Sequence, residues 1–231
     1  MPHDPKIIVA LDFPTSAEVI AQAEQLEPSL CRVKVGFESF LHGGPALVDA
    51  LMELGFEVFL DLKFHDIPNT VARACAAAAN LGVWMINLHA SGGVKMIAAA
   101  REAIDAQDHR PHLLAVTVLT SADQSQHEAM GFTNSIAEQV STLAATAKAH
   151  GADGVVCSAL EAPLLRKEHA DDFLLVTPGI RPAGTDANDQ ERVVTPSAAI
   201  ANGSSYLVIG RPVTNAENPV EVLEQIHVTL S

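Results

Sequence analysis

The sequence predicts an α/β protein, a single (β/α)8 (TIM) barrel over residues 1–231, and three observations support this. Short runs rich in β-branched residues alternate about eight times with longer alanine-rich stretches of helical character, without a domain-sized linker. The chain has 231 residues and is 48% hydrophobic, which suffices for one large core. Glycines such as Gly55, Gly82 and Gly151 end helical stretches a few residues before the next strand. A doubly wound open sheet is the alternative arrangement of these elements.

The expected strands are short apolar runs, and they lie at residues 6–12, 32–37, 57–63, 83–90, 112–120, 154–159, 173–180 and 206–212. The expected helices are the alanine- and leucine-rich stretches between them, at residues 16–26, 44–55, 69–82, 94–104, 135–151, 161–168, 195–203 and 219–230. The sequence "ASGG" at 90–93 is too short for a nucleotide-binding fingerprint, and we interpret it as a turn into the helix at 94.

Composition and charge narrow the possible partners. The formal net charge of -14 argues against nucleic acid or an anionic membrane surface, because either would need an extended basic face. The N-terminal stretch "MPHDPKIIVALDF" lacks a basic segment followed by a long apolar run, so we expect a cytoplasmic protein with no membrane span. The cysteines are three, scattered and without a CxxC pair, which predicts small core residues rather than disulfides or a zinc site.

Polar residues gather where the expected strands end, which is the edge of a barrel that carries its chemistry. They are Asp12, Lys34, Asp61, Lys63, Asn87, His89, Thr120 and Ser121. Asp61 and Lys63 are two residues apart and therefore face the same side of their strand, while Leu60 and Leu62 face the other. If the leucines pack under the helices, both charges point into the barrel mouth. A structural ion pair is the alternative, but a buried pair gains little stability over apolar residues, so we favour a functional role.

The segment "DLKFHDIPNT" at 61–70 resembles the D-x-K-x-x-D-I-P-N-T signature of the orotidine 5′-monophosphate decarboxylases. Further matches follow in order along nearly the whole chain: "VALD" at Asp12, "KVG" at Lys34, "TVLTS" at Thr120, "TPGIRP" at Arg181 and "IGRP" at Arg211. A bare DxKxxD is shared with sugar-phosphate relatives, whereas the ordered set is highly specific.

The resemblance implies a cofactor-independent decarboxylase that converts orotidine 5′-monophosphate to uridine 5′-monophosphate and CO2, the last step of de novo UMP biosynthesis. Negative charge left at C6 lies outside the ring π system, so electrostatics must stabilise it. Lys63 matches the proton donor, Asp61 lies near the substrate carboxylate, and Lys34 and Asp66 complete an alternating array of charges. The resemblance also implies a homodimer, in which Asp66 and Thr70 reach into the neighbouring site; Ile67 belongs to the same substrate-binding segment.

The substrate's 5′-phosphate is expected at the loops after the seventh and eighth strands, the usual phosphate site of such barrels. Arg211 is the best phosphate clamp, because its planar fork matches a phosphate bidentately, and Gly210 stands beside it. By resemblance, Gln190 contributes from the same loop region and Arg181 helps to hold that loop or the substrate. The resemblance further makes Asp12 a ribose-hydroxyl acceptor and Thr120 a contact of the pyrimidine edge.

Two other functions are compatible with this pattern of charged residues at the strand ends. One is a Mg²⁺-dependent sugar-phosphate decarboxylase or aldolase of the same superfamily, although an ammonium at Lys34 would repel the metal. The other is a non-catalytic barrel that binds a nucleotide, which gives no reason for the crowded Asp/Lys array. His89 with His65 and Asn87 matches no recognised metal-ligand spacing, so we expect no metal.

Overall fold

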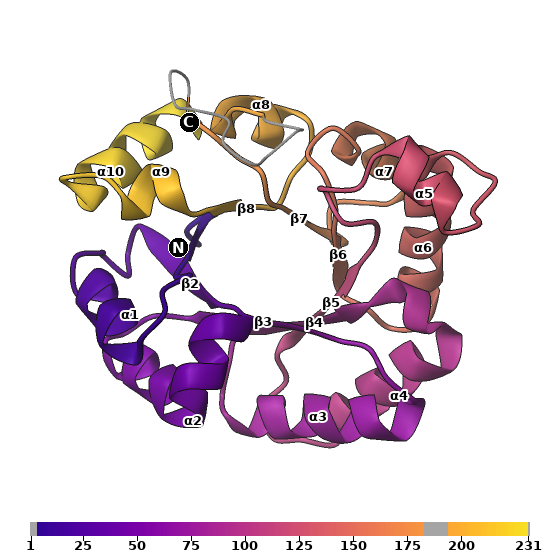
Figure 1. The fold of residues 1–231 in the computed structure, drawn as a ribbon, viewed down its shortest axis with the longest axis horizontal. Coiled ribbons are helices and arrows are strands. Elements are labelled where there is room, and N and C mark those ends of the chain that lie inside the picture. The colour runs from indigo at the N-terminus through magenta and orange to yellow at the C-terminus, as the bar shows by residue number, and fades with distance from the viewer. Residues whose placement is uncertain (1–3, 183–193, 231) are drawn as a thin grey trace.

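The computed structural model describes residues 4–182 and 194–230, and it is a closed barrel of parallel strands surrounded by helices (Figure 1). The strands pair in sequence order, and β8 closes the ring on β1. They are β1 (Ile7–Ala10), β2 (Cys31–Val35), β3 (Val58–Phe64), β4 (Met85–His89), β5 (His112–Val116), β6 (Gly154–Val156), β7 (Leu174–Thr177) and β8 (Tyr206–Ile209). The predicted (β/α)8 barrel is confirmed, and the open sheet is not formed.

Helices follow the strands on the outside of the barrel (Figure 1). They are α1 (Ser16–Ala23), α2 (Phe37–Glu53), α3 (Pro68–Asn80), α4 (Val94–Asp105), α5 (Gln124–Ala129), α6 (Ile136–Ala149), α7 (Ala162–Glu168), α8 (Pro196–Ala201), α9 (Arg211–Thr214) and α10 (Pro219–Leu230), with the 3-10 turn η1 (Ala90–Gly92) before α4. The turn expected at "ASGG" is therefore present. In the described part of the chain, no helix is long and apolar enough to cross a membrane.

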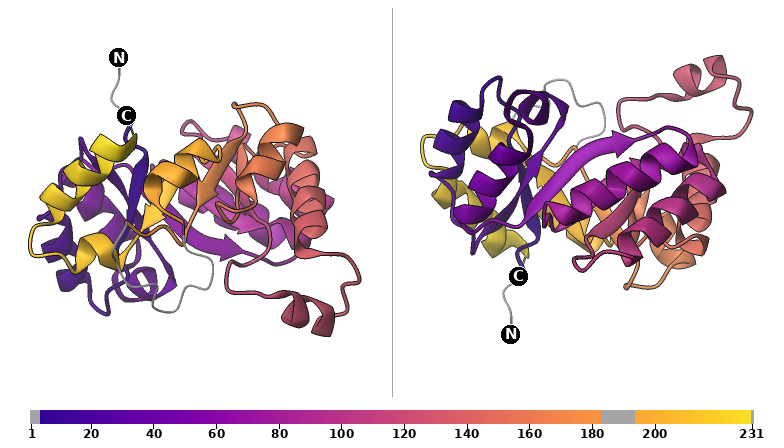
Figure 2. Two further views of the ribbon diagram at one scale, coloured as in Figure 1. Left: turned by 90° about the horizontal axis from the view of Figure 1, so that it is seen from above. Right: turned by 90° about the horizontal axis from the view of Figure 1, so that it is seen from below.

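Three details differ from the sequence-based expectation. The second helix begins at Phe37 rather than Gly44. It is kinked at Gly44, whose non-helical φ of 56° is available to glycine at little cost. The fifth strand ends at Val116, because the chain leaves the barrel there and runs to α5, which stands away from the other helices (Figure 2). The short helices α5 and α9 were not predicted, since six and four residues give too little periodicity to detect.

The strands divide the core into two layers. A large outer layer fills the space between strands and helices and contains Leu60, with Leu62 packed against it. A small inner layer fills the barrel itself and consists of Ile8, Phe59, Met85, Leu114, Val176 and Tyr206. Successive residues of β3 alternate between the layers, so the side chains that follow Phe59 at every second position point inward and upward to the mouth.

Candidate active site

The third strand brings two opposite charges together at the barrel mouth. Leu60 and Leu62 belong to the outer layer, as the alternation predicted, while Asp61 and Lys63 border a common cavity. The Lys63 Nζ lies 2.6 Å from Asp61 Oδ1. Asp61 is 8% exposed, so the carboxylate is nearly removed from water. The predicted placement of both charges is confirmed.

The pair extends into a line of four alternating charges from three strands. Lys34 of β2 lies with its Nζ 3.2 Å from Asp61 Oδ2 and 3.2 Å from Asp12 Oδ1. Gly36 leaves room for this approach, because a Cβ there would make tight contacts of 3.2 Å with both Asp12 Oδ1 and Lys34 Nζ. The mouth therefore carries a charge array in the order Asp12, Lys34, Asp61, Lys63.

The array keeps its central members charged. Burial alone would raise the pKa of Asp61, but Lys34 and Lys63 and the hydrogen bonds from Lys63 and Asn87 lower it below its ordinary value. Burial alone would lower the pKa of Lys34, but Asp61 and Asp12 raise it above its ordinary value. Asp61 is thus a carboxylate and Lys34 an ammonium over the whole neutral range.

A cavity of about 200 Å³ opens beside the array and is mostly apolar apart from the charges. Its wall includes Asp61, Lys63 and Thr120, with Val118 and Leu119 from the same loop as Thr120. Thr120 lies in the loop after β5 rather than at the end of the strand as predicted, and it borders this cavity. A flat ring bound here would have the Lys63 ammonium at its border.

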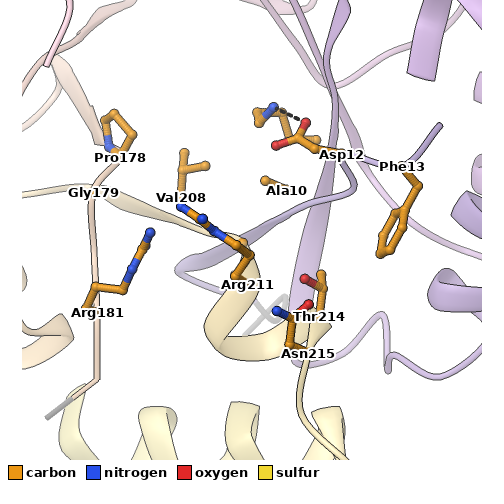
Figure 3. A pocket seen from close by; sticks show the side chains of 12 residues that line it. Ala10, Asp12, Phe13, Pro178, Gly179, Arg181, Val208, Arg211, Thr214 and Asn215 are labelled. Atoms are coloured by element: carbon orange, nitrogen blue, oxygen red, sulfur yellow. Dashed lines mark hydrogen bonds and ion pairs between the residues drawn. The ribbon is translucent and has the colours of Figure 1, made fainter. Parts of the chain in front are cut away.

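A second cavity of about 390 Å³ lies over the ends of β7, β8 and β1 (Figure 3). Arg181 and Arg211 both line it, as do Asp12 and Gly210. Arg181 is buried, its Nη1 donates to the carbonyl of Ile180 at 2.9 Å, and its Nε has no hydrogen-bond partner among the residues that the structure describes. Burial first, and then the charge of Arg211, lower the pKa of Arg181. Two guanidinium groups that face the same space favour an anion there.

The two cavities are neighbours rather than separate sites. Lys34, Pro178 and Val208 border both of them. A molecule with a phosphate near the arginines can therefore extend past Asp12 and Lys34 to Asp61 and Lys63. The site suits an elongated anion with a planar group at the far end.

Asp66 does not join the array within one chain. It is exposed, and its Oδ1 accepts a hydrogen bond from the Ile67 backbone at 2.6 Å. No ion pair links it to a lysine among the residues that the structure describes. Ile67 is 66% exposed, and Thr70, in the first turn of α3, is exposed as well. None of these three predicted residues lines either of the two cavities of its own barrel.

Two other expectations concern residues near the mouth. Gln190 lies outside the described residues, so its predicted place at the phosphate is not tested. His89 contacts His65 through their rings, with centroids 5.4 Å apart, and burial followed by the charges of His65 and Lys63 lowers its pKa. Among residues 4–182 and 194–230, no cluster of three or more His, Cys, Asp or Glu side chains is arranged to hold a metal ion.

Two contacts of the array were not predicted from the sequence. Phe37, the first residue of α2, has its ring centroid 5.6 Å from Lys63 Nζ. Asn87 is completely buried and donates a 2.7 Å hydrogen bond from Nδ2 to Asp61 Oδ1. A buried asparagine inside an apolar strand was the available signal for Asn87, whereas nothing local distinguished Phe37 from a core residue.

The closed parallel barrel, with a line of charges and two arginines at the carboxyl ends of its strands, defines a barrel enzyme for a phosphorylated substrate. A model of the "Orotidine 5'-phosphate decarboxylase / HUMPS family" matches residues 5–226, and the chain belongs to this family. It is 56% identical over 222 residues to the orotidine 5'-phosphate decarboxylase of Teredinibacter turnerae, which covers 96% of both chains. It is 58% identical over 220 residues to that of Alcanivorax borkumensis, with 95% of each covered.

A solved structure agrees with these sequence comparisons. The crystal structure of orotidine 5'-phosphate decarboxylase from Lactobacillus acidophilus superposes with a TM-score of 0.87 at 41% identity, covering 99% of this chain and 100% of that one. The likeness extends over the whole chain, and it includes the barrel end on which the charge array stands.

Proposed function

We propose that the chain, acting as one catalytic domain, decarboxylates orotidine 5′-monophosphate to uridine 5′-monophosphate and CO2. Membership of the family supports the reaction. The single observation that carries the proposal is the Asp61 carboxylate, which is buried between two lysines at the wall of the smaller cavity. A buried carboxylate at this place would repel the carboxylate of the substrate, and a protein that only binds the nucleotide has no need of this repulsion.

In the proposed chemistry, the bond between C6 and the carboxylate carbon breaks and its electron pair stays on C6. The Lys63 ammonium stabilises this charge and then gives C6 a proton, after which solvent reprotonates the lysine. Asp61 stands beside the substrate carboxylate, where two unit charges about 4 Å apart repel by roughly 4 kcal/mol at an effective dielectric near 20. Release of neutral CO2 relieves this repulsion, while Lys34 holds Asp61 in its charged form.

The other end of the substrate is assigned to the larger cavity. Arg211 binds the phosphate, Arg181 supports it from the cavity wall, and Gly210 leaves room beside them. Gln190 is proposed to add a contact from the loop between β7 and α8. Asp12 accepts from a ribose hydroxyl, and Thr120 contacts the pyrimidine edge. The order of these groups along the two cavities matches the order of phosphate, ribose and base in a nucleotide.

A homodimer with shared sites is part of the proposal. Asp66, Ile67 and Thr70 are exposed beside the mouth rather than directed into it. Apolar side chains lie exposed on the nearby α2, where Phe37 is 54% and Leu41 82% exposed. A second copy of the chain would cover these apolar groups and receive Asp66 and Thr70 at its own charge array.

Mixing two inactive variants tests the shared site. Lys63→Ala and Asp66→Ala homodimers should each be nearly inactive, whereas their heterodimer contains one site with both defects and one with neither. Statistical pairing should restore roughly a quarter of wild-type activity per site, if the sites act independently. Verified heterodimers without recovery would place Asp66 at the site of its own subunit.

We further propose that the reaction needs no cofactor and takes place in the cytoplasm. The three cysteines are free and buried, which suits a reducing compartment. A single assay tests the function: purified protein should release CO2 from orotidylate, and the rate should be unchanged by a chelator. Loss of activity in chelator would favour the Mg²⁺-dependent alternative, and binding without CO2 release would favour a nucleotide-binding protein.

A further inference from the structure

The pairing register of the third and fourth strands shifts at one place, and this place lies at the charge array. Pairing runs regularly through Leu60 opposite Ile86, but the next aligned pair is Phe64 opposite Leu88. Three residues of β3, Asp61 to Lys63, therefore stand opposite the single residue Asn87. The strand bulges here and loses its regular ladder of backbone hydrogen bonds.

The Asn87 side chain bridges the two ends of this bulge. Its Nδ2 donates to the carboxylate of Asp61 at 2.7 Å, and its Oδ1 accepts from the backbone N–H of Lys63 at 2.8 Å. Asn87 is 0% exposed and borders neither of the two cavities that form the site. Both the oxygen and the nitrogen of the amide thus form hydrogen bonds with residues of the array, and the side chain does not border the space that a substrate would occupy.

The backbone of Lys63 needs such support. Its φ of 44° makes it the only residue other than glycine with a positive φ in the described part of the chain. This left-handed conformation is unfavourable for any residue with a Cβ atom, and it persists only where surrounding contacts enforce it. The hydrogen bond from Lys63 N–H to Asn87 is a contact of this kind, because it replaces the ladder bond missing at the bulge.

We propose that Asn87 is a positioning residue for the decarboxylation, which fixes the Asp61 carboxylate and the strained Lys63 backbone in one rigid unit. The inference rests on the proposed function of Lys63 and Asp61. One oxygen of Asp61 is held by Lys63 Nζ and Asn87 Nδ2, and the other by Lys34. Without the amide, Asp61 can rotate and the Lys63 backbone can relax, so the ammonium leaves its place beside the reacting carbon.

The first test replaces the amide by an apolar group of similar size. Asn87→Leu should lower kcat for CO2 release by about 100-fold, the order of loss expected from a misplacement of about 1 Å, while KM stays within about threefold. The KM is expected to stay because Asn87 does not border the cavities. Retention of kcat within about threefold, or a rise of KM with kcat unchanged, overturns the proposal.

A second variant tests the hydrogen bonds themselves and remains informative if Asn87→Leu does not fold. In Asn87→Asp, an ionised carboxylate would repel Asp61, but the neutral acid has the shape of the amide and can donate to Asp61 as Nδ2 does. Burial and the negative charge of Asp61 favour the neutral acid at position 87, whereas the ammonium groups of Lys34 and Lys63 favour the ionised form. The half-buried His89 is a further titratable group nearby. The kcat of this variant relative to wild type should therefore rise about tenfold as pH falls from about 8 to about 5. A ratio that is flat over this range overturns the proposal.

A matched control separates positioning from general stability. Thr177 is also fully buried in a barrel strand, and its hydroxyl donates to Ser204 Oγ at 3.0 Å, away from the array. Thr177→Val should lose thermal stability in circular dichroism yet keep kcat. An equal loss of kcat in Thr177→Val and Asn87→Leu would assign Asn87 to the fold alone. Activity of the wild type is measured first, so that failure of the proposed function is seen independently.

Discussion

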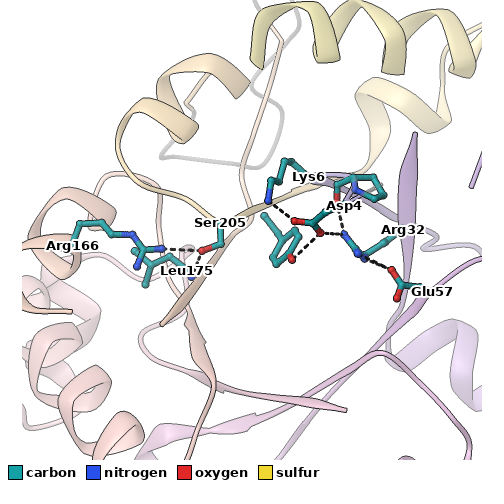
Figure 4. Close-up of polar contacts among 9 residues, drawn as sticks. Asp4, Lys6, Arg32, Glu57, Arg166, Leu175 and Ser205 are labelled. Carbon is teal, nitrogen blue, oxygen red and sulfur yellow. Dashed lines mark hydrogen bonds and ion pairs between the residues drawn. The ribbon is translucent and has the colours of Figure 1, made fainter. Parts of the chain in front are cut away.

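The two ends of the barrel each carry a line of four alternating charges, but the lines serve different purposes. At the mouth the order is Asp12, Lys34, Asp61, Lys63. At the base it is Lys6, Asp4, Arg32, Glu57 (Figure 4). The first three strands and the residues that flank them supply both lines. Arg32 and Lys34 lie two residues apart on β2, and Glu57 and Asp61 lie two residues before and after Phe59.

Only the centre of the base network is enclosed, because the side chains of Lys6, Asp4 and Glu57 are 45%, 46% and 53% exposed. The Arg32 guanidinium lies 4.1 Å from the Trp84 ring centroid and 5.1 Å from that of Tyr206, and the Tyr206 hydroxyl donates to Asp4 at 3.0 Å. The side chain of Arg32 is 6% exposed, whereas that of Lys63 at the mouth is 26% exposed and borders a cavity. At the base, the buried cation packs against aromatic rings, whereas at the mouth a partly exposed lysine borders a cavity beside a buried carboxylate. The surroundings of the central charges, rather than the presence of an alternating line, distinguish the two ends.

The largest expected effect compares one lysine from each end. Lys63→Ala should reduce CO2 release by more than about 1000-fold, because the proton donor is lost, and leave the thermal midpoint nearly unchanged. Lys6→Ala removes the same charge at the base and should keep activity within about twofold. Steady-state rates and circular dichroism of both variants check this. Near-wild-type kcat in Lys63→Ala would show that the mouth is not the reactive end.

The next effect concerns the arginine side of the mouth. Arg211→Ala should lower kcat/KM about 100-fold, because a charge-assisted contact to the phosphate is lost. Added phosphite should partly restore turnover of a substrate that lacks the phosphate in the wild type, since remote binding energy is used in the transition state. Arg110→Ala, at an exposed arginine before β5, is the control and should leave both kcat/KM and the phosphite-activated turnover unchanged. Without activation by phosphite, Arg211 would serve only to anchor the substrate.

At the base, the expected effect is on stability instead of rate. Arg32→Met should lower the free energy of unfolding by about 1–3 kcal/mol, because the contacts with two aromatic rings and two carboxylates are lost. The rate constant kcat should stay within about twofold. Urea unfolding and the CO2 assay on the same preparation measure both quantities. A loss of kcat larger than the loss of folded protein would mean that the base also positions the mouth.

The smallest effect is the pH dependence of stability that the mouth contributes. The pKa of Asp61 is lowered in the folded state, so its contribution is present above its unfolded pKa of about 3.9 and is lost as pH falls further. The pKa of Lys34 is raised, so its contribution is present below about 10.4 and is lost as pH rises further. Both contributions should be constant from about pH 5 to about pH 9. Unfolding free energies of wild type and Asp61→Asn should therefore differ by a constant amount in this window and converge in acid.

Much of the mouth could be predicted from local sequence. The two-residue period of a strand placed Asp61 and Lys63 on one side before any contact was known, and the ordered motifs indicated Lys34, Thr120, Arg181 and Arg211. Asp66 could not be placed in this way. It follows the strand, where the period no longer applies, and it is exposed rather than joined to the array of its own chain.

The base network and the role of Asn87 were not predictable from the residues alone. Arg32 meets Asp4 and Glu57 because β1 and β3 pair on either side of β2, and it meets Tyr206 only because the barrel closes and brings β8 beside β1. Asn87 meets the ends of the bulge only because β3 and β4 shift their register after Leu60. Each contact depends on which distant residues become neighbours.

By itself, the sequence determined the order of the strands and of the longer helices, the polar side of the third strand and the family to which the chain belongs. These follow from the backbone period and from motifs within a few residues. Only the tertiary structure decided which charges are accessible, which are enclosed and which amide holds the bulge at Lys63. The physical reason is that alternation is a local property of the backbone, whereas register, closure and exposure are set by packing between segments far apart in the chain.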